Sequence, residues 1–269
     1  MSKIVSRNGW PTMGSPHPSQ RRALFSLKTV GIRIPMISPP RKVDIAGIVA
    51  AARGLYSAGV ADFPFALADP ALAAWLARVM DSENKIPRAL DAIGGLAGRD
   101  VLLLGPSAEY RAAQLRALGA HVTTTPLSRL GGRPAASADA VVACWTPLDR
   151  PGPAAERGHE QATRVLRPGG RLLLLTDYGR DDVARLAPGP EVPDEPSTLR
   201  RRDTWFTARG FKLHVIHAWW RFESCAQAAE FLEAAFGERG RAVASAVQRP
   251  RLSHKLVIYH RAVDSGEKE

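Results

Sequence analysis

The sequence predicts an α/β fold with a doubly wound, mostly parallel sheet and an antiparallel strand at its C-terminal edge. Three observations predict it. The apolar runs 101–104 and 172–175 lack polar alternation, which is typical of strands buried between helices in a parallel sheet. Amphipathic helical segments alternate with strands, and glycines mark the helix ends. Pro168-Gly169-Gly170 separates a helix from the second apolar run, which predicts a tight turn.

The expected elements fall into three groups along the chain. N-terminal helices are expected over 43–56, from Pro70 with Asp69 as the cap, and over 86–96. Core strands are expected at 101–104, 121–125, 139–145 and 171–176, with core helices at 108–118 and 156–166. The C-terminal part is expected as helix 198–209, strand 211–219, two inserted helices (224–236 and 238–247) and strand 255–260. This last strand is short and mixed, as is typical of an antiparallel edge strand.

The positive charge of the chain is concentrated in its N-terminal segment. Residues 1–43 are rich in Pro, Ser and Gly, and they carry eight of the eleven net positive charges. We expect a solvated basic tail there, with contact to nucleic acid or a membrane surface as the alternative. One domain is expected over 44–263, with N-terminal helices over 44–97, the core sheet over 98–187 and a C-terminal part over 198–261 that holds the insertion 223–247. Its nearly balanced charge shows no clear nucleic-acid site.

Several classes of protein and site are not indicated. The two cysteines, Cys144 and Cys225, form no disulfide framework, which predicts a reducing compartment and a cytoplasmic protein. No apolar run approaches the roughly 18 residues that span a bilayer. We expect no metal, because no Cys or His cluster has zinc spacing. The sequence contains neither a G-x-S-x-G elbow nor a P-loop, and it does not predict an oligomeric state.

Four sequence blocks resemble the class I S-adenosylmethionine-dependent methyltransferases. They are residues 98–105, 117–123, 138–145 and 167–175, and the Gly210-Phe211 pair before a strand also fits. The resemblance covers about residues 88–261. It implies a Rossmann-like domain, S-adenosylmethionine as cofactor and methyl transfer to a small-molecule acceptor. The N-terminal helices and the insertion would then form a lid over the site.

The chain departs from the pattern of that family around the cofactor. Leu103 stands where the family usually has an acid, and Ser107 and Glu109 stand at later glycine positions. Thr125 stands where an acid normally accepts hydrogen bonds from the ribose hydroxyls. Losing two such bonds costs roughly 3–6 kcal/mol. Only the ten residues 129–138 occupy a connection where the family usually has a helix and a strand, so we expect both to be shortened or missing.

Five residues near strand ends are candidate cofactor contacts. Gly105 would let the ligand approach the backbone. Ser107 and Tyr110, at the next helix N-terminus, would hold the carboxylate of an amino-acid ligand. Thr125 would bond one ribose hydroxyl, and Trp145 would form an aromatic wall for adenine or substrate. The structural alternatives are a tight turn at Gly105, a helix cap at Ser107 and an ordinary β-branched strand residue at Thr125.

The candidate catalytic residues are Asp177 and Tyr178, which follow the strand expected at 171–176. Asp177 would act as a general base and Tyr178 as a substrate contact. The alternative is a turn in which Asp177 caps the next helix. His159 lies on a polar helix and is expected to be solvated.

Two further functions remain open beside methyl transfer. A non-catalytic binding or scaffold protein would keep the sheet without the cofactor, and the missing acids favour it. A nicotinamide-dependent oxidoreductase is less favoured, because G-x-G-x-x-G is absent and Thr125 stands at the ribose position.

Overall fold

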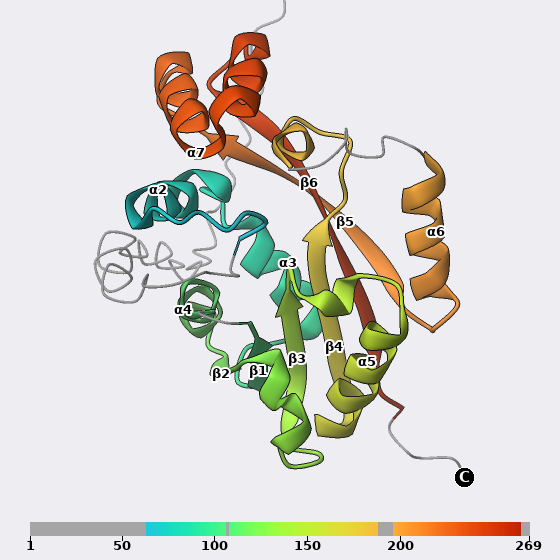
Figure 1. Cartoon of the computed structure of the whole chain (residues 1–269). Coiled ribbons are helices and arrows are strands. Elements are labelled where there is room, and N and C mark those ends of the chain that lie inside the picture. Colours follow the sequence, from blue (N-terminus) through green and yellow to red (C-terminus); the bar gives the residue numbers. More distant parts are fainter. Residues whose placement is uncertain (1–62, 106–107, 188–195, 265–269) are drawn as a thin grey trace, which may run out of the picture. The chain divides into compact units, whose positions relative to one another are not determined.

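The computed structural model describes residues 63–105, 108–187 and 196–264 (Figure 1). The predicted tail over 1–43, the helix expected over 43–56 and the candidate residue Ser107 lie outside the described residues. Within the described part, no helix is long and apolar enough to cross a membrane.

The described strands form one six-stranded sheet in the order β2-β1-β3-β4-β6-β5. Their bounds are β1 (Asp100–Leu104), β2 (His121–Thr125), β3 (Ala138–Cys144), β4 (Leu166–Asp177), β5 (Lys212–Arg221) and β6 (Arg251–Ala262). Strands β2, β1, β3 and β4 are parallel, and β6 is antiparallel to both β4 and β5. The mostly parallel α/β sheet and the antiparallel C-terminal strand are as predicted. However, β6 is twelve residues long and lies between β4 and β5, so β5 forms the edge.

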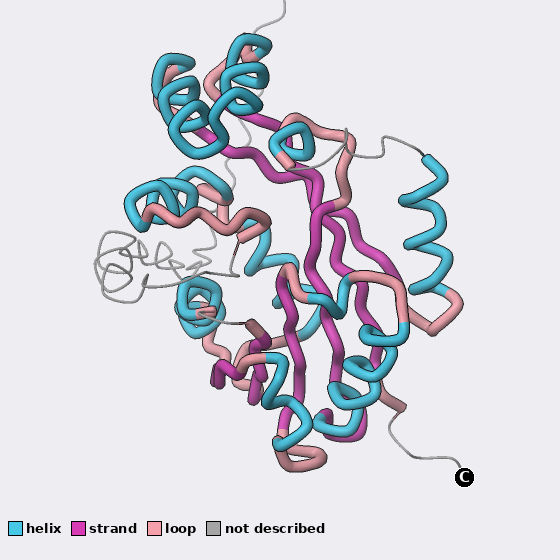
Figure 2. The backbone as a smooth tube through the Cα atoms, viewed as in Figure 1, coloured by secondary structure: helices cyan, strands magenta, loops and turns pink. Residues whose placement is uncertain are grey.

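Helices cover both faces of the sheet, as expected for a doubly wound fold (Figure 2). The first core lies under α2 (Pro70–Met80), α3 (Lys85–Gly94), α4 (Glu109–Ala117) and α7 (Cys225–Ala246). The second core lies under α5 (Pro153–Val165) and α6 (Pro196–Thr207). Alternate residues of β4 supply the two cores, with Leu173 and Leu175 in the first and Leu172 and Leu174 in the second. This double burial explains the continuous apolar run in the sequence.

The connection between β2 and β3 is reduced, as predicted. It contains the 3-10 helix η1 (Leu127–Gly132), and β2 forms an edge of the sheet. Two further 3-10 helices follow strand ends: η2 (Pro147–Asp149) comes after β3, and η3 (Val183–Leu186) comes after β4. They place polar residues at the carboxyl edge.

The turn predicted at Pro168-Gly169-Gly170 lies inside β4 instead. The Gly169 N–H donates to the Val263 carbonyl oxygen (3.1 Å), and the Val263 N–H donates to that of Gly170 (2.8 Å). The pairing of β3 with β4 shifts register between Ala138 and Ala140, so the segment forms an irregularity in a longer strand. A Cβ at Gly170 would lie 2.8 Å from the Arg167 carbonyl oxygen, which explains the glycine. The Pro-Gly-Gly segment therefore interrupts the regular pairing of β4, but β4 continues on both sides of it.

Helix α2 begins with the predicted cap. Asp69 caps α2 by accepting a hydrogen bond from the Ala71 N–H at 2.7 Å.

At Gly237, with φ of 60°, the backbone of α7 leaves the helical region, which confirms the two inserted helices expected there.

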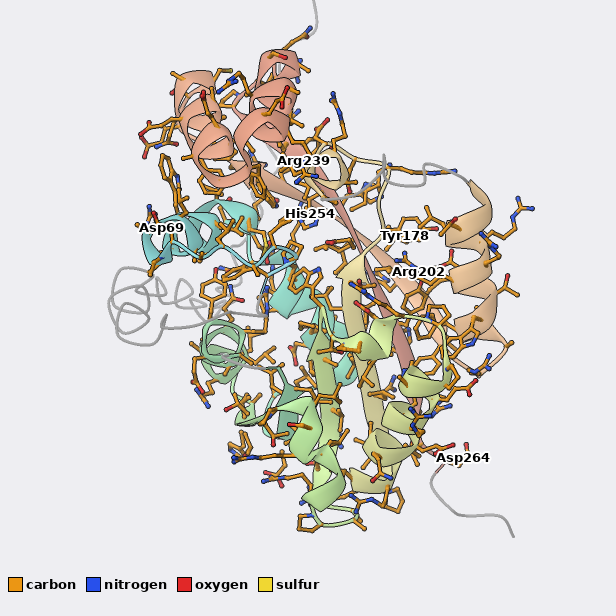
Figure 3. All side chains as sticks on the ribbon, viewed as in Figure 1. Asp69, Tyr178, Arg202, Arg239, His254 and Asp264 are labelled. Carbon is orange, nitrogen blue, oxygen red and sulfur yellow. The ribbon has the colours of Figure 1, made fainter. Side chains whose placement is uncertain are left out.

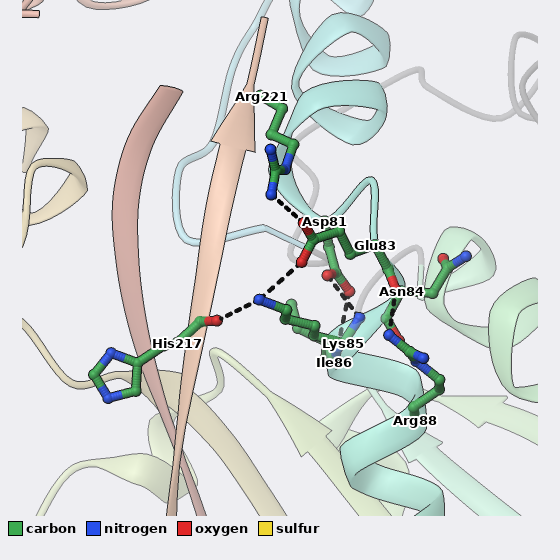
Figure 4. A network of polar contacts seen from close by, with 8 residues as sticks. All are labelled: Asp81, Glu83, Asn84, Lys85, Ile86, Arg88, His217 and Arg221. Atoms are coloured by element: carbon green, nitrogen blue, oxygen red, sulfur yellow. Dashed lines mark hydrogen bonds and ion pairs between the residues drawn. The ribbon is translucent and has the colours of Figure 1, made fainter. Parts of the chain in front are cut away.

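Helix α3 is held at its N-terminus by a polar network that reaches β5 (Figure 4). The buried Asp81 carboxylate accepts from the N–H groups of Lys85 (2.8 Å) and Ile86 (2.9 Å). The Lys85 ammonium donates to the His217 carbonyl oxygen at 3.0 Å, and Glu83 pairs with Arg221. Burial raises the pKa of Asp81. The network fixes α3 against the edge strand.

Candidate functional site

The candidate site lies at the carboxyl ends of the parallel strands. In the sheet, β2 lies on one side of β1 and β3 lies on the other side of β1. The strand order therefore reverses between β1 and β3. Ligands of open α/β sheets bind beside such a reversal. Gly105 follows β1 and Trp145 follows β3, so both candidates flank this point. The Gly105 N–H donates to the Thr125 carbonyl oxygen at 3.2 Å, which joins the ends of β1 and β2.

Trp145 has an unusual backbone conformation. Its φ is 48°, a backbone conformation that is costly for a bulky residue. Residues with such strained conformations cluster at functional sites. Two hydrogen bonds hold it: its backbone N–H donates to the Leu175 carbonyl oxygen (2.9 Å), and its indole Nε1 donates to Asp177 Oδ1 (3.0 Å). The indole is therefore directed across the end of β4.

Asp177 is hydrogen-bonded to three other residues of this region. Its Oδ1 accepts from Trp145 Nε1 and also lies 2.9 Å from His254 Nε2. Its side chain remains 39% exposed, so the carboxylate is both oriented and accessible. Arg202 Nη1 donates to the backbone carbonyl oxygen of the same residue at 2.9 Å.

His254 was not among the sequence candidates, although it holds Asp177. It lies in β6, is 1% exposed, and its Nδ1 accepts from the indole Nε1 of Trp220 at 3.1 Å. Because an indole N–H can only donate, Nδ1 carries a lone pair and the proton of the neutral ring is on Nε2, facing Asp177. Trp145, Asp177, His254 and Trp220 thus form a continuous hydrogen-bonded set, here called the polar chain. They come from the ends of β3 and β4 and from β6 and β5, four neighbouring strands.

Tyr178 lies on the other face of the sheet from Asp177, because successive strand residues alternate. Figure 3 shows His254 on the side toward α7, and Tyr178 and Arg202 on the side toward α6. The Tyr178 hydroxyl donates to Asp203 Oδ2 at 3.2 Å. Burial, then the Asp203 charge, raises the pKa of Tyr178. The structure therefore does not bring the two predicted catalytic side chains together.

A second polar group surrounds Tyr178 in the second core. The Tyr259 hydroxyl donates to Asp203 and accepts from Arg202 Nε at 2.9 Å. Nearby, Asp149 of η2 is buried and is hydrogen-bonded to Thr176. Burial raises the pKa of Asp149 to about 6, although Thr176 and Arg202 oppose this change. Asp149 was not among the sequence candidates, and its only sequence signal is an acid shortly after the strand that ends at Cys144.

The helix-capping role considered for Asp177 is taken by Asp181 instead. Asp181 Oδ1 accepts from the Ala184 N–H at 2.7 Å, at the start of η3. Asp182 Oδ2 accepts from the Ser253 N–H (2.8 Å) and hydroxyl (2.7 Å). Asp177 is thus left for contacts at the sheet edge.

The remaining cofactor candidates occupy separate places. The Tyr110 hydroxyl donates to the Ala77 carbonyl oxygen (2.8 Å), so this side chain is directed toward α2. Thr125 is buried, with 6% exposure, at the end of β2. Beside it, the Thr124 hydroxyl donates to Glu109 Oε1 at 3.2 Å, and Arg116 pairs with Glu109 Oε2. Glu109 therefore brings a carboxylate close to the end of β2, where the sequence lacks an acid.

The prediction for His159 was wrong. Its ring is buried, with 4% exposure, and Nε2 lies 2.9 Å from the Leu148 carbonyl oxygen. It packs among Trp205, Phe206 and Phe211 from α6 and the segment that follows it, and burial lowers its pKa. The sequence of α5 is mostly polar because only a narrow stripe of the helix is buried.

Aromatic side chains of α2, β5 and α7, and of residues beside α2 and β5, form a cluster beside the polar chain, here called the aromatic cap. The cap consists of Phe65, Trp75, Trp220, Phe222, Phe231 and Phe236. Trp75 of α2 contacts Phe231 of α7 with ring centroids 5.3 Å apart, so the two helices pack directly. Trp220 belongs both to the cap and to the polar chain.

Comparisons with known proteins find similarity in structure alone. No family model matches the chain, and no curated protein matches it by sequence. The YcgJ protein from Bacillus subtilis is 12% identical with a TM-score of 0.42, over 67% of this chain and 98% of that one. The cyclase SpnF is 16% identical with a TM-score of 0.40, over 68% and 82%. Phosphoethanolamine N-methyltransferase 2 from Haemonchus contortus, in complex with S-adenosyl-L-methionine, is 13% identical with a TM-score of 0.35, over 69% and 39%.

Proposed function

We propose that this chain is an S-adenosylmethionine-dependent methyltransferase-like enzyme that acts on a small-molecule acceptor. The sequence blocks 98–105 and 167–175 suggest the family, and the polar chain supplies a site. The observation that carries the proposal is the oriented and partly exposed carboxylate of Asp177 at the carboxyl edge of the sheet. Asp177 is the proposed base for the proton of the acceptor.

The chemistry of this edge suits a positively charged ligand. S-adenosylmethionine supplies, when bound, a methyl group attached to a cationic sulfur. A carboxylate attracts a cation, and so does the face of an indole ring. Asp177 supplies the carboxylate and Trp145 the indole, and one hydrogen bond joins the two side chains. Methyl transfer otherwise requires alignment of the reactants and exclusion of water, which the neighbouring aromatic cap favours.

Glu109 is the proposed acceptor for the ribose hydroxyls. It is 41% exposed and is held by Thr124 and Arg116 near the end of β2. A carboxylate there would offset the roughly 3–6 kcal/mol that two lost charge-assisted hydrogen bonds cost. Gly105, joined to Thr125 by a hydrogen bond, remains a proposed cofactor contact, and so does Ser107, which lies outside the described residues.

Thermal unfolding of the full chain with S-adenosylmethionine or S-adenosylhomocysteine tests the proposal. A ligand at 100 times its Kd adds about 2.7 kcal/mol, a rise of several degrees. We expect Asp177→Asn and Glu109→Gln to reduce this rise, and Asp264→Asn, at an exposed site outside the candidate region, to preserve it. No rise at millimolar concentrations of either ligand would overturn the proposal.

A non-catalytic binding or scaffold protein is the second candidate. Tyr110 bonds to Ala77, and Thr125 is buried, so two of the proposed cofactor contacts already have structural roles. A folded protein whose unfolding temperature responds to neither cofactor would favour this function. A response to NAD or NADP alone would favour the oxidoreductase instead.

A further inference from the structure

We propose that His254 is a positioning residue that orients Asp177 and links it to the aromatic cap. The inference rests on the proposed role of Asp177 in the function above. It adds a residue that no sequence motif selected, and it makes the geometry of the site dependent on the packing of α2 and α7.

The hydrogen bonds of His254 determine which ring nitrogen holds the proton. Trp220 Nε1 donates to Nδ1 at 3.1 Å, and Nε2 lies 2.9 Å from Asp177 Oδ1. A second proton, on Nδ1, would face the indole N–H and would break that bond inside a site where His254 is only 1% exposed. The arrangement therefore favours the tautomer that donates from Nε2 to Asp177.

The backbone around His254 is fixed by acidic side chains. Pairing of β4 with β6 ends at Asp177 and Leu256, so His254 lies just beyond the last paired residue of β4. There Asp182 binds the Ser253 N–H at 2.8 Å, and Asp181 Oδ2 accepts from the Lys255 N–H at 2.5 Å. Both chain neighbours of His254 are thus held against the segment that follows Asp177.

The other end of the link lies in the aromatic cap. Trp220 contacts Phe65, next to α2, at a centroid distance of 6.0 Å, and Phe231 and Phe236 of α7 at 6.3 Å. A displacement of either helix would move the Trp220 indole and its hydrogen bond to His254. The cap therefore acts on Asp177 through one histidine.

The indole N–H of Trp145 reports the orientation of Asp177 without any ligand. Trp145 bonds to the same Oδ1 as His254. In ¹H–¹⁵N spectra of the full chain, assigned with Trp145→Phe, we expect His254→Leu to shift this signal and to speed its hydrogen exchange at least tenfold. His254→Gln, whose amide can donate to Asp177, should restore slow exchange.

A purely structural role for His254 predicts a different result. An unchanged Trp145 signal in folded His254→Leu would overturn the inference. If His254→Leu fails to fold, Trp220→Phe takes its place, because it removes the donor to Nδ1 of His254. We then expect hydrogen exchange at the Trp145 indole to be at least threefold faster. An unchanged exchange rate would overturn the inference. Cofactor binding is measured separately, so its failure would overturn the proposed function and leave this result standing.

Discussion

The indole N–H of Trp220 donates to Nδ1 of His254 across 3.1 Å, with both side chains at 1% exposure or less. This bond connects the edge strand β5 to β6 and leaves Nε2 of His254 for Asp177. A single buried hydrogen bond thereby joins the aromatic packing of the first core to the polar carboxyl edge of the sheet.

Trp220→Phe should reduce stability more than its neighbour Trp219→Phe. The phenyl ring keeps part of the aromatic packing but leaves the buried Nδ1 of His254 without a donor, which costs about 1–3 kcal/mol. Trp219 is half-buried and stacks under Arg251, so its replacement should cost less. Urea unfolding of both variants measures the difference, and equal losses would contradict the importance of the Trp220 bond.

Asp149 should make the stability depend on pH. Burial raises its pKa from 3.8 to about 6 in the folded chain. Between these values the folded chain holds a proton that the unfolded chain releases, so the free energy of unfolding falls as the pH rises from 4 through 6. The difference between the two pKa values corresponds to about 3 kcal/mol.

Asp149→Asn isolates this contribution, because the amide cannot titrate but can still accept a hydrogen bond. We expect the fall in unfolding free energy between pH 4 and pH 7 to be smaller in the variant by roughly 2 kcal/mol, since part of the full difference develops only below pH 4. Exposed Asp264→Asn serves as the control and should follow the natural chain. Parallel profiles for Asp149→Asn and the natural chain would show that the carboxyl group titrates normally.

Local sequence patterns predicted most of the sheet because they reflect burial on two faces. The run 101–104 and the strand His121–Thr125 agree with the structure to within one residue. The position of β6 was harder to predict, because the polar side chains of Ser253, His254 and Lys255 made its first half look exposed. Their partners come from distant parts of the chain, so only the tertiary structure shows that His254 is buried.

The candidate site was predictable only where it depends on local sequence. Asp177 ends β4 and Trp145 follows β3, so both lie at strand ends, which is a local property, and the structure joins them by one hydrogen bond. His254 and Trp220 lie 77 and 43 positions after Asp177, and their role depends on the pairing of β4, β6 and β5. No local spacing encodes that pairing. Tyr178 was selected for its position next to Asp177, but strand alternation directs it to the other face.

Asp81→Ala should destabilise the start of α3. Two backbone N–H groups, those of Lys85 and Ile86, would lose their acceptor in a mostly buried place, which costs about 1–3 kcal/mol. Glu83→Gln alters a more exposed ion pair of the same network and should have a smaller effect. Denaturant unfolding compares the two, and a larger loss for Glu83→Gln would refute the capping role of Asp81.

Gly240→Ala should disrupt the packing between the two halves of α7. The chain reverses at Gly237, and a Cβ at Gly240 would overlap the carbonyl oxygen of Leu232. Because this obstacle is backbone, the two halves must separate, and we expect a loss of about 1–3 kcal/mol or more. Gly131→Ala, where an added Cβ meets nothing within 4 Å, is the matched control and should be nearly neutral. Since α7 carries Phe231 and Phe236 of the aromatic cap, Gly240→Ala should also speed hydrogen exchange at the Trp220 indole. A variant as stable as Gly131→Ala, with unchanged exchange at Trp220, would contradict the close approach of these two helices.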